Sequence, residues 1–142
     1  MNPSLIVLEK RMRSGLFAVE GVFTSSPDEL ISNRYDAEFE HQWLRVSDCV
    51  EQLKRVVPTD NESQKLITFI AEEAFKLVFK WSANSELAAL VYDDIELIAY
   101  AVVLGYEDPW LNALLKAYLD HRFPTGLLEL LPGRLSEVIN SV

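Results

Sequence analysis

The chain has 142 residues, of which 49% are hydrophobic and 25% charged, with 22 acidic and 13 basic side chains and a net charge of −9. This length and hydrophobic content predict one folded domain, and they exclude a disordered or low-complexity chain. The negative charge argues against a nucleic-acid-binding protein, because affinity for nucleic acid comes largely from lysine and arginine at the phosphates.

Cysteine content and the apolar segments predict a cytoplasmic protein. Cys49 is the single cysteine, so an internal disulfide is impossible. The apolar stretch at residues 5–8 has its basic residues after it rather than before it, unlike a signal peptide. The longest apolar run, residues 97–104, has eight residues, whereas a membrane-spanning helix needs about 20. We therefore expect no membrane partner.

The first 25 residues fit two kinds of structure. Residues 3–13 could form a helix, whereas residues 16–19 and 22–24 could form short strands. The sequence leaves both alternatives open. We expect this segment to pack on the remainder of a single helical domain that spans residues 1–142.

A capping box begins the next helical segment. Ser26 stands at the N-cap position and Glu29 follows three residues later, with a proline between them. Apolar residues then recur with the helical period until Pro58, which ends the segment. Asn33 or Asp36 could divide it into two helices, and the sequence does not decide between one helix and two.

A second capping-box pattern, at residues 59–62, predicts a helix that ends near residues 82–84. Asn84 or Ser85 then caps another helix. Gly105 suits the left-handed position at the end of that helix.

The helix that follows Asn84 is expected to be the central one. From residue 95 to 104 it is apolar on nearly every side, which is typical of a buried helix. Asp93 and Asp94 interrupt this apolar pattern, and we interpret them as a kink or as a new N-cap.

The C-terminal third is expected to be helical as well. Asp108 followed by a proline predicts a helix to about His121, then a short helical turn at 127–131 and a last helix at 134–139. The whole pattern predicts an all-α, single-domain bundle of about five to seven helices.

The negative charge is concentrated in residues 82–108, which hold six acidic residues and no lysine or arginine. Tyrosines are interleaved with these acids, and a tryptophan follows them. We expect this segment to form the contact surface for a basic protein partner, because such surfaces speed encounter and aromatic anchors add affinity. The predicted contact residues are Glu86, Asp93, Asp94, Glu96, Tyr106, Glu107, Asp108 and Trp110.

Two explanations of these acids stay open. Glu86 and Asp108 stand at predicted helix starts, where the helix dipole favours a negative charge whatever the function. In class and charge, however, the chain resembles the bacterial immunity proteins that bind cationic nuclease toxins. This resemblance implies a non-catalytic inhibitor of a basic toxin, with no cofactor. We expect Trp110 to be partly exposed on such a surface.

Arg34 and His41, separated by six residues, resemble the Arg-x(4–6)-His element of the HEPN family of all-helical ribonucleases. This resemblance implies a dimer in which the two side chains cleave RNA without a metal. Three acids between them and the lack of a basic patch depart from the family. A self-associating structural subunit, such as a homodimer, is a further alternative.

A metal site and a cysteine nucleophile are both disfavoured. Glu38 and His41 have the Glu-x-x-His spacing of ferritin-like sites, but His121, the other histidine, has no acid at the matching position. On one helix His41 and Cys49 would lie about 12 Å apart along the axis, too far to share a hydrogen bond. We therefore expect neither a metal nor a catalytic residue.

Overall fold

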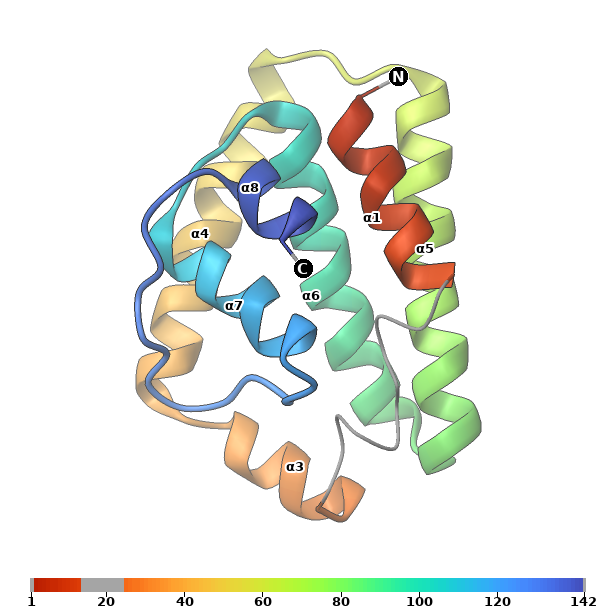
Figure 1. The fold of residues 1–142 in the computed structure, drawn as a ribbon. Coiled ribbons are helices and arrows are strands. Elements are labelled where there is room, and N and C mark those ends of the chain that lie inside the picture. The colour runs from red at the N-terminus through yellow and green to blue at the C-terminus, as the bar shows by residue number, and fades with distance from the viewer. Residues whose placement is uncertain (1, 14–24, 142) are drawn as a thin grey trace.

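The computed structural model describes residues 2–13 and 25–141, and in these ranges it consists of seven α-helices and no strand (Figure 1). The all-α, single-domain prediction is confirmed. Residues 3–13 are helical, whereas the alternative strands at 16–19 and 22–24 lie outside the described residues. The helices are α1 (Pro3–Arg13), α3 (Pro27–Arg34), α4 (Ala37–Val56), α5 (Asn61–Ser82), α6 (Ser85–Leu104), α7 (Pro109–Leu119) and α8 (Leu135–Asn140).

Helix α6 is the centre of the bundle, as its apolar sequence predicts. It packs against α1, α3, α4, α5 and α7, and its antiparallel pairing with α5 is the most extensive in the described chain (Figure 1). Because neighbours surround it, apolar residues are buried on several of its sides. The largest fully buried ones are Leu87, Ile95 and Ile98.

The predicted helix boundaries are largely confirmed by their caps. The Ser26 hydroxyl accepts a hydrogen bond from the Glu29 amide at 3.3 Å, and the Asn84 side chain accepts one from the Leu87 amide at 2.9 Å. Gly105 ends α6 in the left-handed conformation, with φ of +72°. The Ser26 and Asn84 side chains thus accept hydrogen bonds from backbone amides that have no acceptor within the helix.

The segment after Ser26 is divided into two helices at Asp36. Helix α3 ends at Arg34, and the Asp36 carboxylate accepts hydrogen bonds from the Glu38 and Phe39 amides, both at 3.0 Å. At the start of α5 the cap lies one residue later than the capping-box pattern predicted. There Asp60 accepts from the Ser63 amide at 2.6 Å.

The interpretation of Asp93 and Asp94 as a kink or a new N-cap is wrong. Helix α6 runs through both positions without interruption. Asp94 is fully buried and Asp93 is exposed, so neighbouring residues in the sequence face opposite environments. The sequence pattern shows only two polar residues in an apolar helix, whereas tertiary contacts decide which one is buried.

The helical turn predicted at residues 127–131 is also wrong, because that segment belongs to an irregular loop between α7 and α8. Polar contacts to α7 hold the end of this loop. The Asn112 amide donates to the Leu131 and Gly133 carbonyls at 3.0 and 2.8 Å, and the Leu131 amide donates to the Pro109 carbonyl at 3.1 Å. These bonds satisfy the backbone without a helix.

A buried carboxylate joins four helices. Asp94 of α6 accepts hydrogen bonds from the Trp43 indole of α4 at 2.9 Å and from the Tyr118 hydroxyl of α7 at 2.6 Å. It also forms an ion pair with Arg34 at the end of α3. Three donors from three helices thus surround one charge that has no contact with solvent.

The Arg34 side chain is fixed on its other sides as well. Its guanidinium lies 4.1 Å from the centre of the Phe39 ring and 5.0 Å from that of Phe123, and it donates to the Pro124 carbonyl at 3.3 Å. Burial opposes its charge, but Asp94 outweighs this effect and raises the pKa of Arg34 above its ordinary value. Arg34 therefore connects α3 to the loop that follows α7.

Replacing Asp94 by asparagine is expected to lower the free energy of unfolding by about 3–5 kcal/mol, because the buried Arg34 charge loses its partner. Urea denaturation measures this loss. The matched control is Asp93→Asn, the same substitution one residue earlier at an exposed position, which is expected to change stability by about 0.5 kcal/mol or less. Equal effects of the two variants would contradict the assigned role of Asp94.

Candidate protein-binding site

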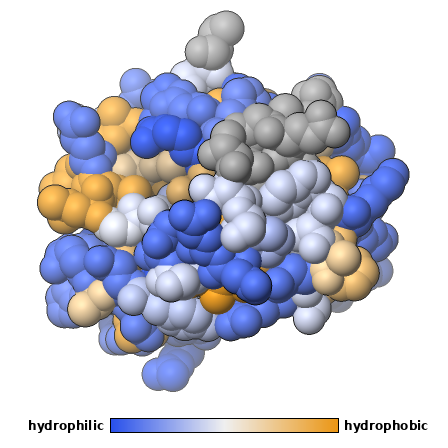
Figure 2. Space-filling model, turned by 90° about the horizontal axis from the view of Figure 1, so that it is seen from below, coloured by the Kyte–Doolittle hydropathy of each residue, from blue (hydrophilic) through white to orange (hydrophobic). Residues whose placement is uncertain are grey.

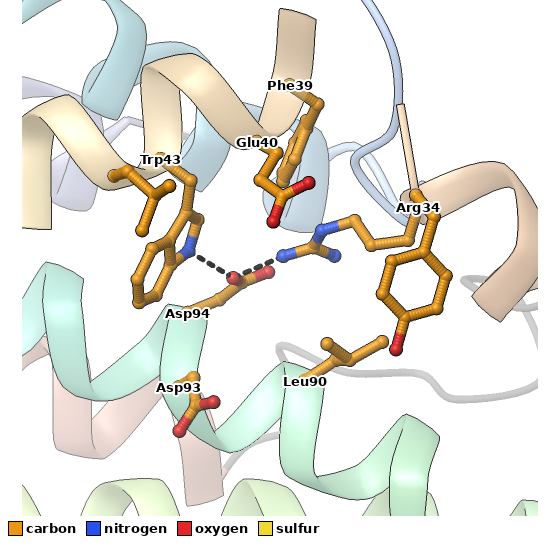
Figure 3. A pocket seen from close by; sticks show the side chains of 9 residues that line it. Arg34, Phe39, Glu40, Trp43, Leu90, Asp93 and Asp94 are labelled. Atoms are coloured by element: carbon orange, nitrogen blue, oxygen red, sulfur yellow. Dashed lines mark hydrogen bonds and ion pairs between the residues drawn. The ribbon is translucent and has the colours of Figure 1, made fainter. Parts of the chain in front are cut away.

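A pocket of about 210 Å³ opens between α3, α4 and α6, next to the Arg34–Asp94 pair (Figure 3). Sites for small-molecule ligands usually measure about 300–1,000 Å³. This pocket is smaller, and it has room for a single side chain of a partner. Its lining residues are Arg34, Tyr35, Phe39, Glu40, Trp43, Leu44, Leu90, Asp93 and Asp94.

Apolar and aromatic side chains form much of the pocket wall. Tyr35 and Leu44 are 64% and 51% exposed, which is unusual for large apolar groups, while Trp43 and Leu90 are half-buried. The Tyr35 hydroxyl donates to Glu86 of α6 at 2.7 Å. This bond ties the end of α3 to α6 across the lower part of the molecule and orients the tyrosine ring.

The charges at the pocket mouth are acidic. Glu40 of α4 and Asp93 of α6 lie on opposite sides of the Arg34–Asp94 pair (Figure 3), and both are exposed. Arg34 is the one cation in the lining, and Asp94 neutralises it. The bottom of the pocket is therefore electrically neutral, and its rim is negative.

The acids gather where α4 and α6 begin. Both helices start at the lower end of the molecule in Figure 1, beside α3, and hydrophilic side chains cover most of this end in Figure 2. Glu38 and Glu40 lie in the first turn of α4 and Glu86 in that of α6. Their charges are compatible with the positive ends of the helix dipoles.

Asp93 is the acid whose environment opposes its charge. Partial burial, followed by the neighbouring Asp94 and Glu96 carboxylates, raises the pKa of Asp93, although Arg34 acts in the opposite direction. The hydrogen bond to Glu86 likewise raises the pKa of the Tyr35 hydroxyl. The Tyr35 hydroxyl therefore stays protonated as a donor, whereas the ionised Asp93 is held at some cost to the stability of the fold.

The structure divides the eight predicted contact residues into two groups. Glu86, Asp93 and Glu107 are exposed, and Glu96 and Tyr106 are half-buried. The other three, Asp94, Asp108 and Trp110, are buried. Asp108 and Trp110 make contacts within the fold, and Asp94 lies at the bottom of the pocket, where its carboxylate is occupied by Arg34, Trp43 and Tyr118.

Asp108 and Trp110 lie on either side of Pro109, the first residue of α7, and contacts to other elements bury both. Asp108 is the N-cap of α7 and accepts from the Trp110 amide at 2.8 Å, while Arg45 donates to its two oxygens at 2.7 and 3.2 Å. The expectation that Trp110 is partly exposed is wrong: its ring packs edge-on against Phe39, with centroids 5.3 Å apart. The neighbouring Glu107 accepts from the Leu135 amide at 2.7 Å and so supports the start of α8.

Sequence reasoning missed the contribution of α3 and α4 to the pocket, namely Tyr35, Glu40 and Leu44. The sequence did contain one indication that α4 has an exposed apolar side chain. Trp43 and Leu44 are adjacent apolar residues on one helix, about 100° apart around its axis, so one of them tends to leave the core. Tyr35 likewise stands at the break between two helices, where the apolar period no longer dictates burial.

The residues of the HEPN-like element do not form a site. Arg34 is buried against Asp94, whereas His41 is exposed on a different helix. The break at residues 35 and 36 removes the helical register that would have placed them on one face. In the described ranges no group of three or more His, Cys, Asp or Glu side chains could hold a metal ion.

The comparisons with known proteins identify the family. The family model described as Immunity protein PIM1 matches residues 7–125, most of the chain, and the chain belongs to this family. The expectation of an immunity protein is thereby confirmed as to family. No curated protein and no solved structure matches the chain. None of the described helices is long and apolar enough to cross a membrane.

Because the folded state raises the pKa of Asp93, this carboxyl stabilises the fold below its unfolded pKa of about 3.9 and loses that contribution as the pH rises through the folded value. The variant Asp93→Asn is expected to lack this pH dependence, so that it becomes more stable relative to the wild type as the pH rises. The measurement is the free energy of unfolding of both proteins from acidic to neutral pH. A difference between them that does not increase with pH would contradict this assignment, and an NMR titration of the Asp93 carboxyl gives an independent check.

Proposed function

We propose that this member of the Immunity protein PIM1 family binds a basic toxin stoichiometrically and neutralises it without catalysis. The contact surface is the acidic pocket, which we define by Tyr35, Glu40, Leu44, Glu86 and Asp93. The observation that carries the proposal is the combination, in one concave surface, of exposed apolar anchors and an uncompensated negative rim. Glu96 lines a neighbouring, smaller pocket that shares Trp43 and Asp93 with this surface.

The charge of the chain favours a cationic partner. At a net charge of −9, the protein attracts a basic molecule over several ångströms of solvent and accelerates encounter. The rim acids then select the orientation in which a basic segment of the toxin faces the pocket. A neutral or acidic partner would gain neither advantage.

The pocket supplies anchoring contacts for a single cationic side chain. A lysine or arginine of the toxin could place its aliphatic stem against Leu44 and Leu90 and its charge between Glu40 and Asp93. The Tyr35 and Trp43 rings offer faces on which a guanidinium stacks favourably. Because the pocket is small, one such side chain would fill it and exclude water, as binding hot spots do.

The raised pKa of Asp93 supports a binding role rather than a stabilising one. A surface acid that only stabilised its helix would lie where its charge is favoured. Asp93 instead is partly buried and lies near the Asp94 and Glu96 carboxylates, and a positive group from a partner would offset both effects. We also propose a cytoplasmic location, with which the single free cysteine, Cys49, is compatible because it forms no disulfide.

Neutralisation can be tested in cells. The tagged protein is used to capture partners from the lysate of its native host, and elution with a salt gradient selects electrostatic complexes. Each captured protein is then expressed alone and together with this chain. We expect one basic protein that arrests growth alone and is harmless when co-expressed. If no captured protein arrests growth, or if co-expression gives no protection, the proposal fails.

The contact surface is tested with charge reversals. Asp93→Lys and Glu40→Lys are each expected to slow association with the captured toxin about tenfold or more at low ionic strength, measured by stopped flow or surface plasmon resonance. Glu62→Lys is the control, since it makes the same charge change at an exposed position in the first turn of α5. Equal slowing by all three variants would assign the effect to net charge and not to the pocket.

A further inference from the structure

We propose that the basic partner of the acidic pocket also places an apolar side chain in a second hollow, between α5 and α6, on the other side of Asp93. We name this surface the aromatic hollow, and its lining residues are Glu72, Phe75, Lys76, Ala89, Tyr92 and Asp93. The proposal rests on the proposed function, since it takes the bound toxin as the occupant and adds the chemical class of its binding segment.

Asp93 separates the two surfaces and belongs to both of them. It lines the acidic pocket and the aromatic hollow alike. Successive residues of an α-helix are turned by about 100° around the axis, so Asp93 lies between Ala89, which lines the hollow, and Leu90, which lines the pocket. In Figure 3 the Asp93 side chain points away from the Arg34–Asp94 pair. One exposed carboxylate thus divides two adjoining concave surfaces.

The aromatic hollow has apolar walls. Its volume is about 330 Å³, and Phe75 of α5 and Tyr92 of α6 line it, both half-buried. Phe79, one helical turn after Phe75, is 45% exposed, and the two rings are stacked with their centroids 6.0 Å apart. An exposed aromatic pair beside a hollow is typical of surfaces that bind another protein.

The charges around the aromatic hollow are mainly negative. Burial raises the pKa of the Tyr92 hydroxyl, and three nearby carboxylates raise it further. These carboxylates belong to Glu96, Glu72 and Asp93. Among the described residues Lys76 is the one cation of the lining, and the Glu73 carboxylate lies 3.6 Å from it. A positively charged partner is therefore favoured at the hollow as it is at the pocket.

A second copy of this chain matches these charges less well than a basic toxin does. The chain carries −9 overall, and its basic helix α1 uses two arginines for contacts within its own chain. Arg11 donates to the Ile139 carbonyl at 2.7 Å. Arg13 lies 5.0 Å from the centre of the Phe69 ring and 3.6 Å from the Glu9 carboxylate. Charge complementarity thus selects the toxin as the occupant.

The size of the acidic pocket also requires a wider contact. A stable protein–protein interface buries about 800 Å² on each partner, whereas the pocket of about 210 Å³ holds a single side chain. The aromatic hollow adjoins it at Asp93 and supplies apolar area. Burial of apolar area slows dissociation, while the acids mainly speed association.

The spacing of the two surfaces defines a pattern for the partner. In an extended segment, side chains two residues apart point to the same side and lie about 7 Å from each other. A cation and an apolar side chain at this spacing can straddle the single carboxylate of Asp93. The expected pattern in the toxin is an arginine or lysine, any residue, and then an apolar residue, in either chain direction.

Blocked tripeptides test the proposal without the toxin. Arg-Gly-Phe, its reverse Phe-Gly-Arg, and Arg-Gly-Gly are each titrated into the isotope-labelled full chain and followed by NMR. All three are expected to shift the Trp43 indole N–H, which reports on the acidic pocket. The phenylalanine peptide of the matching direction is expected to bind about tenfold more tightly than Arg-Gly-Gly, and also to shift the Ala89 and Tyr92 amides.

The variant Ala89→Gln fills the hollow at an exposed position without a change of charge. It is expected to remove the tenfold gain and to bind Arg-Gly-Gly as the wild type does. The matched control is Thr68→Gln, at an exposed position of α5 outside both surfaces, which is expected to keep the gain. If Ala89→Gln does not fold, Phe79→Ser, which removes the exposed ring, is measured instead and is expected to reduce the gain.

Equal affinities of the three tripeptides overturn the proposal, as does a gain that persists in Ala89→Gln. Shifts of the Ala89 and Tyr92 amides that follow protein concentration without any peptide would assign the hollow to a second copy and would also overturn it. Growth protection by co-expression decides the proposed function separately. A chain that protects against its toxin but has no preference for the phenylalanine peptides keeps the proposed function and contradicts this inference alone.

Discussion

The buried carboxylate of Asp94 is the constraint on which the rest of the structure depends. An ionised group without solvent is costly unless hydrogen bonds and an opposite charge compensate it. Here the compensation comes from Arg34, Trp43 and Tyr118, which belong to three different helices. Each helix must therefore keep its position relative to α6. Apolar packing alone would allow these helices to shift over one another, whereas the hydrogen bonds fix one arrangement.

The same constraint shapes the pocket. Arg34 ends α3 and points inward to Asp94, so the chain leaves the helix with Tyr35 on the outside. Trp43 donates its indole to Asp94 and forms part of the pocket wall. Since Asp94 cancels the Arg34 charge, the acids at the mouth stay uncompensated. One ion pair thus positions the apolar wall and leaves the rim negative.

The sequence by itself determined most of the helices and supported the interpretation as an immunity protein, which agrees with the family match. Caps such as Ser26 and Asn84, the glycine at 105 and the apolar period act within a few residues of the chain, so local physics fixes them. The concentration of acids, which supported the immunity-protein interpretation, is likewise a property of composition. Only the tertiary structure decided which acids are exposed. Asp93 and Asp94 are chemically identical and adjacent, and α6 turns one toward the pocket mouth and the other toward Arg34, a residue 60 positions away. Burial of a charge depends on such distant partners, and no local pattern records them.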